Sequence, residues 1–210
     1  MKIAFIGIGK VGFALADNLS KVGYEVVVAS DDTQSESVQQ ALKSNVKLRQ
    51  VSLIEGTTWA EIVFLAVPFK AVEGLVTSLN LQGKILVDCT NPVGPGMTHG
   101  LASQQSGTEM IQKLKPTSKV VKSFTIYGYE NFINTVYPGY EGLKPAMLIA
   151  GDDEAAKQVI STLCVALGWE AIDTGSSSQA LHLEHMTLLW IKMARVQGQG
   201  SDFVWARLRR

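Results

Sequence analysis

Cysteine is scarce in this sequence of 210 residues. Its two cysteines, Cys89 and Cys164, lie far apart, lack the spacing of a metal site and are each flanked by apolar residues. This arrangement is typical of buried thiols in a reducing compartment, and it excludes a small scaffold held together by disulfides. We therefore expect a cytoplasmic protein and no bound metal.

An excess of charge of either sign is also missing. The 19 Lys and Arg residues balance the 19 Asp and Glu residues, so no long-range field would attract nucleic acid. Long apolar runs are missing too: the longest, Ile62 to Val67, is far too short to cross a bilayer, and no secretion signal is recognisable near the N-terminus. We expect neither a nucleic acid nor a membrane as a partner.

What the sequence does contain is an alternation of short apolar runs with helical patterns. With 46% hydrophobic residues the chain can bury a sizeable core. Alternating strands and helices are typical of βαβ units, so we predict an α/β fold of the Rossmann type, a doubly wound and mostly parallel sheet. The predicted strands are Lys2–Ile6, Glu25–Ala29, Glu61–Val67, Lys84–Cys89, Lys119–Phe124, Pro145–Ala150 and Glu170–Ile172.

The C-terminal part departs from this alternation. A Gly-Ser cluster, Gly175 to Ser178, leads into a long helical pattern from Gln179 to about Val196 whose circumference is largely apolar. We interpret residues 1–210 as a single NAD(P)-binding Rossmann domain, with 177–210 as a C-terminal helical extension and tail. Because so apolar a helix needs burial on more than one side, we expect it to pack on the sheet and to offer part of its surface to a homodimer.

A glycine-rich motif follows the first predicted strand and opens a helix. In Gly7-Ile8-Gly9-Lys10-Val11-Gly12 the first glycine permits a tight turn, the second lets a pyrophosphate approach the backbone, and the third allows close helix packing. The position between a strand and a helix is the context that such a motif requires. We predict that these six residues bind a dinucleotide; the alternative is a purely structural turn.

The end of the second predicted strand bears on the choice between NADP and NAD. Ser30 stands where an acidic residue would hold the ribose 2′-hydroxyl of NAD, and it leaves room for the 2′-phosphate of NADP. Asp31 and Asp32 follow it, where a cation would be expected for a phosphate. Asp31 could turn to the ribose and select NAD, or both aspartates could be solvated, with Asp32 capping the next helix. We favour NADP and keep NAD as the alternative.

Together with the glycine motif, several segments in order make the chain resemble a known family, the coenzyme F-420-dependent NADP oxidoreductases. Relatives of this family include the reductase domains of membrane ferric reductases. The likeness covers nearly the whole chain. Beyond the glycine motif it rests on Leu65-Ala66-Val67-Pro68, Val87-Asp88-Cys89-Thr90-Asn91-Pro92, Val121-Lys122-Ser123-Phe124, Ala150-Gly151-Asp152-Asp153 and Asp173-Thr174-Gly175.

The resemblance implies positions for the cofactor. It places Ala66, Val67 and Pro68 beside the adenosine and pyrophosphate, and Asn91 and Pro92 toward the nicotinamide. All are at the ends of predicted strands, where parallel sheets bind ligands. Taken without the resemblance, Pro68 is equally a helix start and Asn91-Pro92 a plain turn. Family members often carry Ser-Arg after the second strand, where this chain has Ser-Asp.

The resemblance also implies that residues 125–134 lie over the nicotinamide. Backbone atoms there, beginning at Thr125, would hold the carboxamide. Tyr127, Tyr129 and Phe132 would flank a planar acceptor, although aromatic residues are as often part of a core. Hydride transfer between two rings needs alignment and exclusion of water more than an acid or base, so we assign no catalytic residue.

We therefore expect an enzyme, an NAD(P)H-dependent oxidoreductase that passes a hydride between the nicotinamide and a small-molecule redox acceptor. The resemblance implies deazaflavin F-420, and a flavin or a ferric chelate remains open. One alternative is a dehydrogenase of small carbonyl compounds with Lys122 or His185 as its acid; another is an NAD(P)-binding module without turnover. His182, Glu184 and His185 lie close in sequence, but they lack the further ligands that a metal site needs.

Overall fold

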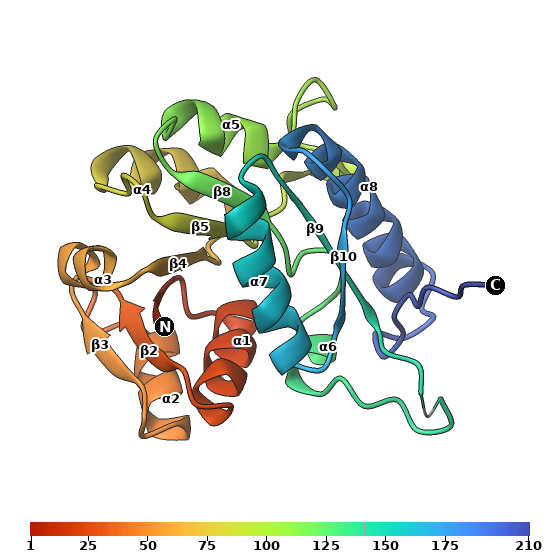
Figure 1. Cartoon of the computed structure of the whole chain (residues 1–210), viewed down its shortest axis with the longest axis horizontal. Coiled ribbons are helices and arrows are strands. Elements are labelled where there is room, and N and C mark those ends of the chain that lie inside the picture. The colour runs from red at the N-terminus through yellow and green to blue at the C-terminus, as the bar shows by residue number, and fades with distance from the viewer. Residues whose placement is uncertain (141) are drawn as a thin grey trace.

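The fold is built on an eight-stranded sheet in the order β10-β9-β8-β5-β4-β1-β2-β3 (Figure 1). The structure is a computed structural model that describes residues 1–140 and 142–210. The strands of this sheet are β1 (Lys2–Ile6), β2 (Glu25–Ala29), β3 (Arg49–Val51), β4 (Ile62–Leu65), β5 (Ile85–Asp88), β8 (Lys119–Lys122), β9 (Ala146–Gly151) and β10 (Glu170–Asp173). A separate hairpin pairs β6 (Val93–Gly94) with β7 (Thr98–His99).

The strand order creates a switch point next to β1. The chain moves outward from β1 through β2 to β3, and then returns to the other side of β1 with β4, β5 and β8. All of these strands are parallel, whereas β9 and β10 run in the opposite direction, since β9 pairs antiparallel with β8 and parallel with β10. Ligands of doubly wound sheets bind where the order reverses, at the carboxyl ends of the strands. The predicted fold class is confirmed.

The helices cover both faces of the sheet. They are α1 (Lys10–Lys21), α2 (Glu36–Ser44), α3 (Leu53–Trp59), α4 (Val72–Ser78), α5 (Gly107–Leu114), α6 (Glu130–Ile133), α7 (Glu154–Ala166) and α8 (Ala180–Ile191). Short 3₁₀ turns are η1 (Phe69–Ala71), η2 (Pro95–Met97) and η3 (Ser177–Gln179), and η4 (Lys192–Val196) is a π-helical turn. The sequence did not predict β3 or the β6–β7 hairpin, since strands of only two or three residues are too short to show a hydrophobic pattern.

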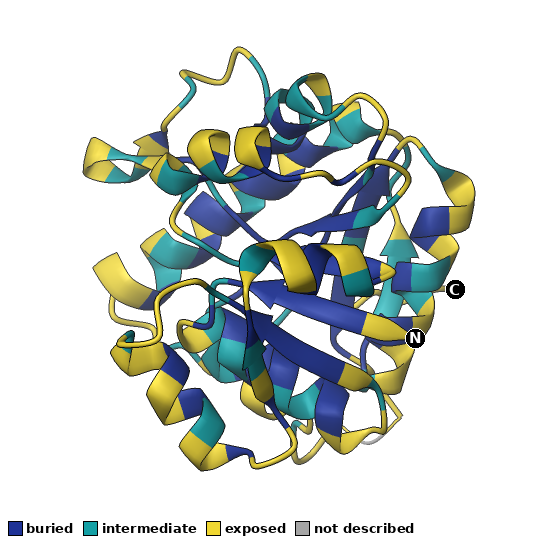
Figure 2. Ribbon diagram, turned by 90° about the vertical axis from the view of Figure 1, so that its left-hand side faces the viewer, coloured by how far each residue is buried: buried dark blue, intermediate teal, exposed yellow. Residues whose placement is uncertain are grey.

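Alternation along the strands builds two cores. Ile3 and Phe5 of β1 pack in a core with residues of α1 and α7, whereas Ala4 and Ile6 pack with residues of α4 and α5. All four of these β1 side chains are buried. Figure 2 shows the central strands buried along almost their whole length, with exposed residues on the outer helices and turns. A strand that is buried on both faces reads as a continuous apolar run, which is why the sequence predicted these strands well.

The C-terminal helix lies at the β9 side of the sheet, as Figure 1 shows. The predicted helix from Gln179 to about Val196 is confirmed: the α-helix covers Ala180–Ile191, and η4 continues it to Val196. The tail then returns to the sheet, where the Ala146 amide donates to the carbonyl oxygen of Trp205 at 2.8 Å. Within the described residues, none of the helices combines the length and the apolar character needed to span a membrane.

Candidate functional site

The glycine turn after β1 packs so closely that two of its glycines are sterically required. Gly7 has a φ of +91°, and a Cβ there would lie 2.5 Å from the carbonyl oxygen of Ala66. A Cβ on Gly12 would lie 2.2 Å from the carbonyl oxygen of Gly7. Any larger residue would therefore push the turn away from the end of β4. These are the roles that the sequence predicts for the first and third glycines.

Gly9 is different, because a Cβ there would meet no atom within 4 Å. It is the N-cap residue of α1 and has no side chain to accept a hydrogen bond from the first turn. The first N–H groups of a helix have no partner within the helix, and they carry the positive end of its dipole. The open space at Gly9 thus lets an anion reach the N-terminus of α1, the role of the second glycine in a dinucleotide site.

The glycine turn opens onto a cleft at the carboxyl ends of β1, β2 and β4. Gly7 and Ile8 line it from the turn, Ser30 and Asp31 from the end of β2, and Val67 from the end of β4, around a cavity of about 300 Å³. These predicted binding residues come from three separate strand ends. The structure therefore brings them together at one place.

The remaining predicted residues of this region adjoin the cleft. Lys10 and Val11 begin α1 directly behind the glycine turn. Ala66 continues β4 past its last ladder residue, since its amide donates to the carbonyl oxygen of Ile6 at 2.8 Å. Pro68 immediately precedes η1, which agrees with the alternative reading of this residue as a helix start.

The two aspartates after β2 are engaged by the neighbouring backbone. Asp31 accepts a hydrogen bond through Oδ1 from the amide of Leu53, the first residue of α3, at 2.9 Å. Asp32 accepts one from the amide of Gln34 at 2.9 Å. The interpretation that Asp32 caps the next helix is wrong: the N-cap of α2 is Ser35, and Asp32 forms a local Asx turn before the helix begins.

Hydroxyl groups surround these aspartates at the β2 end of the cleft. Ser30, Ser35 and Ser37 line the cavity together with Asp31 and Asp32. Among the described residues that line it there is no lysine or arginine. A 2′-phosphate would therefore meet hydroxyl groups and the carboxylates of Asp31 and Asp32 here, and no guanidinium.

Two buried polar atoms without partners lie farther along the same edge of the sheet, beyond the ends of β5 and β8. They are Oδ1 of Asn91 and Oγ1 of Thr125, and neither has a hydrogen-bond partner among the described residues. The two residues adjoin, since Nδ2 of Asn91 lies 3.4 Å from the carbonyl oxygen of Thr125. An unsatisfied buried polar atom costs about 1–3 kcal/mol, so a ligand that supplies both partners would be stabilised here. Pro92 follows directly and leads into the β6–β7 hairpin.

The backbone next to Thr125 is strained. Phe124 has a φ of +55°, a left-handed conformation that a bulky side chain rarely adopts. Its ring is buried between those of Phe64 and Phe132, at centroid distances of 5.8 Å and 6.3 Å. Such strain persists only where the surroundings impose it, and it is concentrated at functional sites. Here the strained residue stands between the end of β8 and the buried Thr125.

Of the three aromatic residues expected to flank an acceptor, two belong to the core. Tyr127 is buried, and its hydroxyl donates to the carbonyl oxygen of Ala146 at 2.8 Å. The rings of Tyr127 and Phe132 both pack on Trp169. Burial raises the pKa of Tyr127 well above its ordinary value. Tyr129 instead lies beside α1, where Nζ of Lys10 is 4.9 Å from its ring centroid.

A buried network of charged side chains, which the sequence did not predict, lies behind Asn91. Nζ of Lys122 donates to Oδ2 of Asp88 at 3.0 Å and to Oε1 of Glu184 at 2.8 Å. Oε2 of Glu184 lies 2.7 Å from Nε2 of His99. Burial by itself would lower the pKa of Lys122, but the two carboxylates raise it above its ordinary value, so the side chain is a cation. Burial, together with Asp88, raises the pKa of the Cys89 thiol, which makes it unreactive.

The structure places both candidate acids for the reduction of a carbonyl compound away from the cleft. Lys122 is fully buried, and besides the two carboxylates its Nζ donates to the carbonyl oxygen of Thr90 at 2.6 Å. His185 is exposed on α8 and lies 3.2 Å from the hydroxyl of Ser103. Neither side chain lines the cleft. Across the described parts of the chain, no group of three or more His, Cys, Asp or Glu residues could hold a metal ion.

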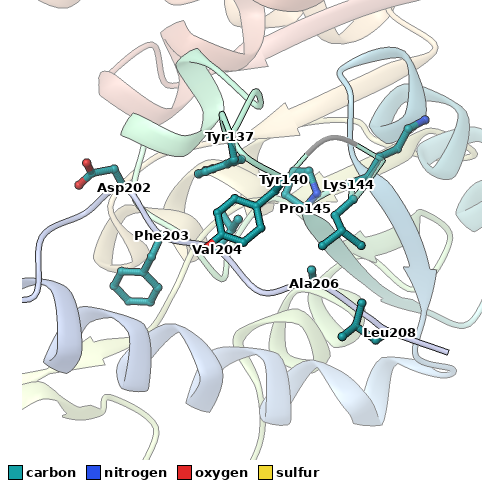
Figure 3. Close-up of a pocket in the computed structure, with 10 residues that line it drawn as sticks. Tyr137, Tyr140, Lys144, Pro145, Asp202, Phe203, Val204, Ala206 and Leu208 are labelled. Atoms are coloured by element: carbon teal, nitrogen blue, oxygen red, sulfur yellow. The ribbon is translucent and has the colours of Figure 1, made fainter. Parts of the chain in front are cut away.

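A second cavity, of about 330 Å³, lies between the C-terminal tail and the segment before β9. Figure 3 shows Tyr137, Tyr140 and Phe203 around it. The hydroxyl of Tyr137 donates to Oδ1 of Asn131 at 2.6 Å, and burial raises its pKa to about 12. No residue of the glycine turn lines this cavity, so it is separate from the cleft.

Comparisons with known sequences agree with the geometry of the cleft. Residues 2–92 match the family described as NADP oxidoreductase, coenzyme F-420-dependent. The chain is 29% identical to metalloreductase STEAP3 of Rattus norvegicus over 89% of its length, but it spans only 36% of that protein. It is 26% identical to the F-420-dependent NADP reductase of Methanothermobacter marburgensis, with 92% of each chain covered.

Solved structures extend the similarity to the whole chain. A candidate F-420-dependent NADP reductase from Arthrobacter sp. FB24 superimposes with a TM-score of 0.85 at 27% identity, and both chains are covered completely. A reductive aminase from Aspergillus terreus, solved in complex with NADPH, has a TM-score of 0.67 at 13% identity and covers 94% of this chain and 63% of its own. The second similarity concerns the fold alone.

Proposed function

We propose that the chain is a member of the family of coenzyme F-420-dependent NADP oxidoreductases and that it transfers a hydride between NADPH and a planar redox cofactor. It is an NADP-dependent oxidoreductase. A deazaflavin such as F-420 is the acceptor that the names of its full-length relatives suggest. A free flavin is the other planar acceptor to be tested. A ferric chelate is tested beside it because of the metalloreductase relative; each Fe(III) takes one electron, so oxidation of one NADPH would reduce two Fe(III) and release a proton.

The observation that supports this function best is the pair of unpartnered atoms beyond β5 and β8. Oδ1 of Asn91 can only accept a hydrogen bond, whereas Oγ1 of Thr125 can donate one. A nicotinamide carboxamide has an NH₂ group and a carbonyl oxygen, which match these two needs. The pair lies on the same sheet edge as the glycine turn, so the chain offers one site for the pyrophosphate and another for the nicotinamide.

The β2 end of the cleft is compatible with NADP. The hydroxyls of Ser30, Ser35 and Ser37 would serve a 2′-phosphate as hydrogen-bond donors. Asp31 already uses Oδ1 for the amide of Leu53, which ties its carboxylate to α3. The affinity for NADPH would then come from hydrogen bonds rather than from a salt bridge.

The chemistry requires little more from the protein than placement. A bound nicotinamide supplies or accepts the hydride, and the acceptor ring must lie against it. The residues of this chain would bind the pyrophosphate at Gly9, orient the carboxamide through Asn91 and Thr125, and close the back of the site with the buried rings around Phe124. A catalytic acid is not required.

A thermal denaturation experiment tests cofactor binding. A ligand that binds only the native protein raises the melting temperature by mass action, so NADPH is expected to raise it more than NADH at equal concentration. Oxidation of NADPH is then followed with F-420, a flavin and a ferric chelate as acceptors. Binding without oxidation by any of the three would refute the proposed hydride transfer, and no stabilisation by either nucleotide would refute the cofactor site itself.

A further inference from the structure

The C-terminal helix α8 contacts both loops that carry the unpartnered atoms. The first contact runs through the buried network: Glu184 of α8 binds Nζ of Lys122 at 2.8 Å, and the same Nζ donates to the carbonyl oxygen of Thr90 at 2.6 Å. Thr90 directly precedes Asn91. The helix is thereby connected to the loop that follows β5.

The second contact is direct. Oγ1 of Thr187, one turn after Glu184 on α8, lies 3.0 Å from the carbonyl oxygen of Thr125 and 3.1 Å from that of Leu183 in its own helix, so the two oxygens share its single donor. The Thr125 oxygen is also the neighbour of Nδ2 of Asn91 at 3.4 Å. The peptide carbonyl of Thr125 is therefore the point where α8, the loop after β5 and the loop after β8 meet.

The network that holds α8 in place is fully hydrogen-bonded. Oδ1 of Asp88 accepts from the amide and the hydroxyl of Thr90, and its Oδ2 accepts from Thr108 and Lys122. The carboxylate of Glu184 accepts from the amide of Gly107 as well as from Lys122. A buried network with every partner present is rigid and specifies one arrangement.

We propose that α8 positions the nicotinamide-binding loops, and that Thr187 is a positioning residue for hydride transfer. The inference rests on the proposed function. Thr187 would touch neither the nicotinamide nor the acceptor; it orients the Thr125 carbonyl, and with it the Asn91 amide and the Thr125 hydroxyl. The phosphates bind elsewhere, at the glycine turn, so Thr187 should affect the alignment of the ring and not the affinity for the dinucleotide.

The replacement Thr187→Val removes the hydroxyl and keeps the shape of the buried side chain. Thr57→Val is a matched control, because Thr57 is also a buried helical threonine but donates only within its own helix, to Leu53 at 2.8 Å and Ile54 at 3.3 Å. Thr187→Ser restores the hydroxyl. One hydrogen bond of ordinary strength changes a rate by about two- to tenfold.

The experiment compares these variants with the wild type in three measurements. They are the Kd of NADPH, kcat with its primary isotope effect from NADPH deuterated at C4, and the fluorescence of bound NADPH, which reports the surroundings of the reduced ring. For Thr187→Val we expect kcat to fall about two- to tenfold, the isotope effect to rise and the fluorescence to change, while Kd stays within about twofold. Thr187→Ser should recover the wild-type kcat, isotope effect and fluorescence. Thr57→Val should leave these three quantities and the Kd unchanged.

The outcomes separate this inference from the proposed function. If Thr187→Val lowers only the melting temperature, or matches Thr57→Val in kcat, isotope effect and fluorescence, the positioning role is refuted. If the wild type binds NADPH but reduces no acceptor, hydride transfer is refuted, and the fluorescence of bound NADPH alone then decides whether Thr187 orients the ring. If the wild type does not bind NADPH, both proposals are refuted.

Discussion

Replacing Gly9 with alanine should separate cofactor binding from folding. The added methyl group would meet no atom of the protein within 4 Å, and the φ of Gly9 is −65°, which alanine adopts readily. Alanine is a poorer N-cap residue than glycine, but the change is at the surface, so we expect the free energy of unfolding without ligand to change by less than about 1 kcal/mol.

The effect of Gly9→Ala on the affinity for NADPH should be much larger. The methyl group would fill the open space through which a pyrophosphate would reach the N-terminus of α1. Losing one hydrogen bond to a charged group removes about 1.5–3 kcal/mol, which corresponds to about a 10- to 100-fold rise in Kd. Gly9→Val, with a larger side chain, should abolish binding.

Titration of NADPH by calorimetry, with urea unfolding of the free protein, measures both quantities. Gly74→Ala is a suitable control, because a Cβ on this α4 glycine also meets nothing within 4 Å. We expect this variant to bind NADPH like the wild type. If Gly9→Ala also binds NADPH with the wild-type Kd, the pyrophosphate does not approach the backbone at Gly9, and the proposed cofactor site is wrong.

Four further predictions follow from the same structure. Gly12→Ala should destabilise the free protein by about 1–3 kcal/mol in urea unfolding, since its Cβ would lie 2.2 Å from the carbonyl oxygen of Gly7. Lys122→Met should destabilise it by about 3–5 kcal/mol, because two buried carboxylates lose their cation; a smaller loss would mean that they take up protons. Asp31→Arg should raise the preference for NADPH over NADH in parallel titrations, and an unchanged ratio would show that this side chain does not face the ribose. Burial raises the pKa of Cys164 from 9.0 to about 12, so the stability that the buried thiol contributes is complete below pH 9 and is lost as the pH rises toward 12. A thiol reagent at pH 8 should therefore react with Cys164 only after unfolding, and prompt reaction with the native protein would contradict this.

The glycine turn was predictable from the sequence. Gly7, Gly9 and Gly12 lie within one turn and one helix start, so their spacing alone indicates which of them pack closely and which leaves open space. The strands were predictable for a similar reason, since burial on both faces makes each an apolar run. Asp32 was misread because a local Asx turn and a helix cap have the same sequence signal.

The sequence by itself determined the Rossmann-type fold and the glycine turn, because both depend on patterns within a few residues of the chain. Only the tertiary structure decided what surrounds Asn91 and Thr125 and which side chains form the buried network behind them. His99 and Glu184 are 85 positions apart, and Lys122 and Glu184 are 62 apart. Their contact depends on the order of strands in the sheet and on where α8 docks, and no local preference of the chain determines either.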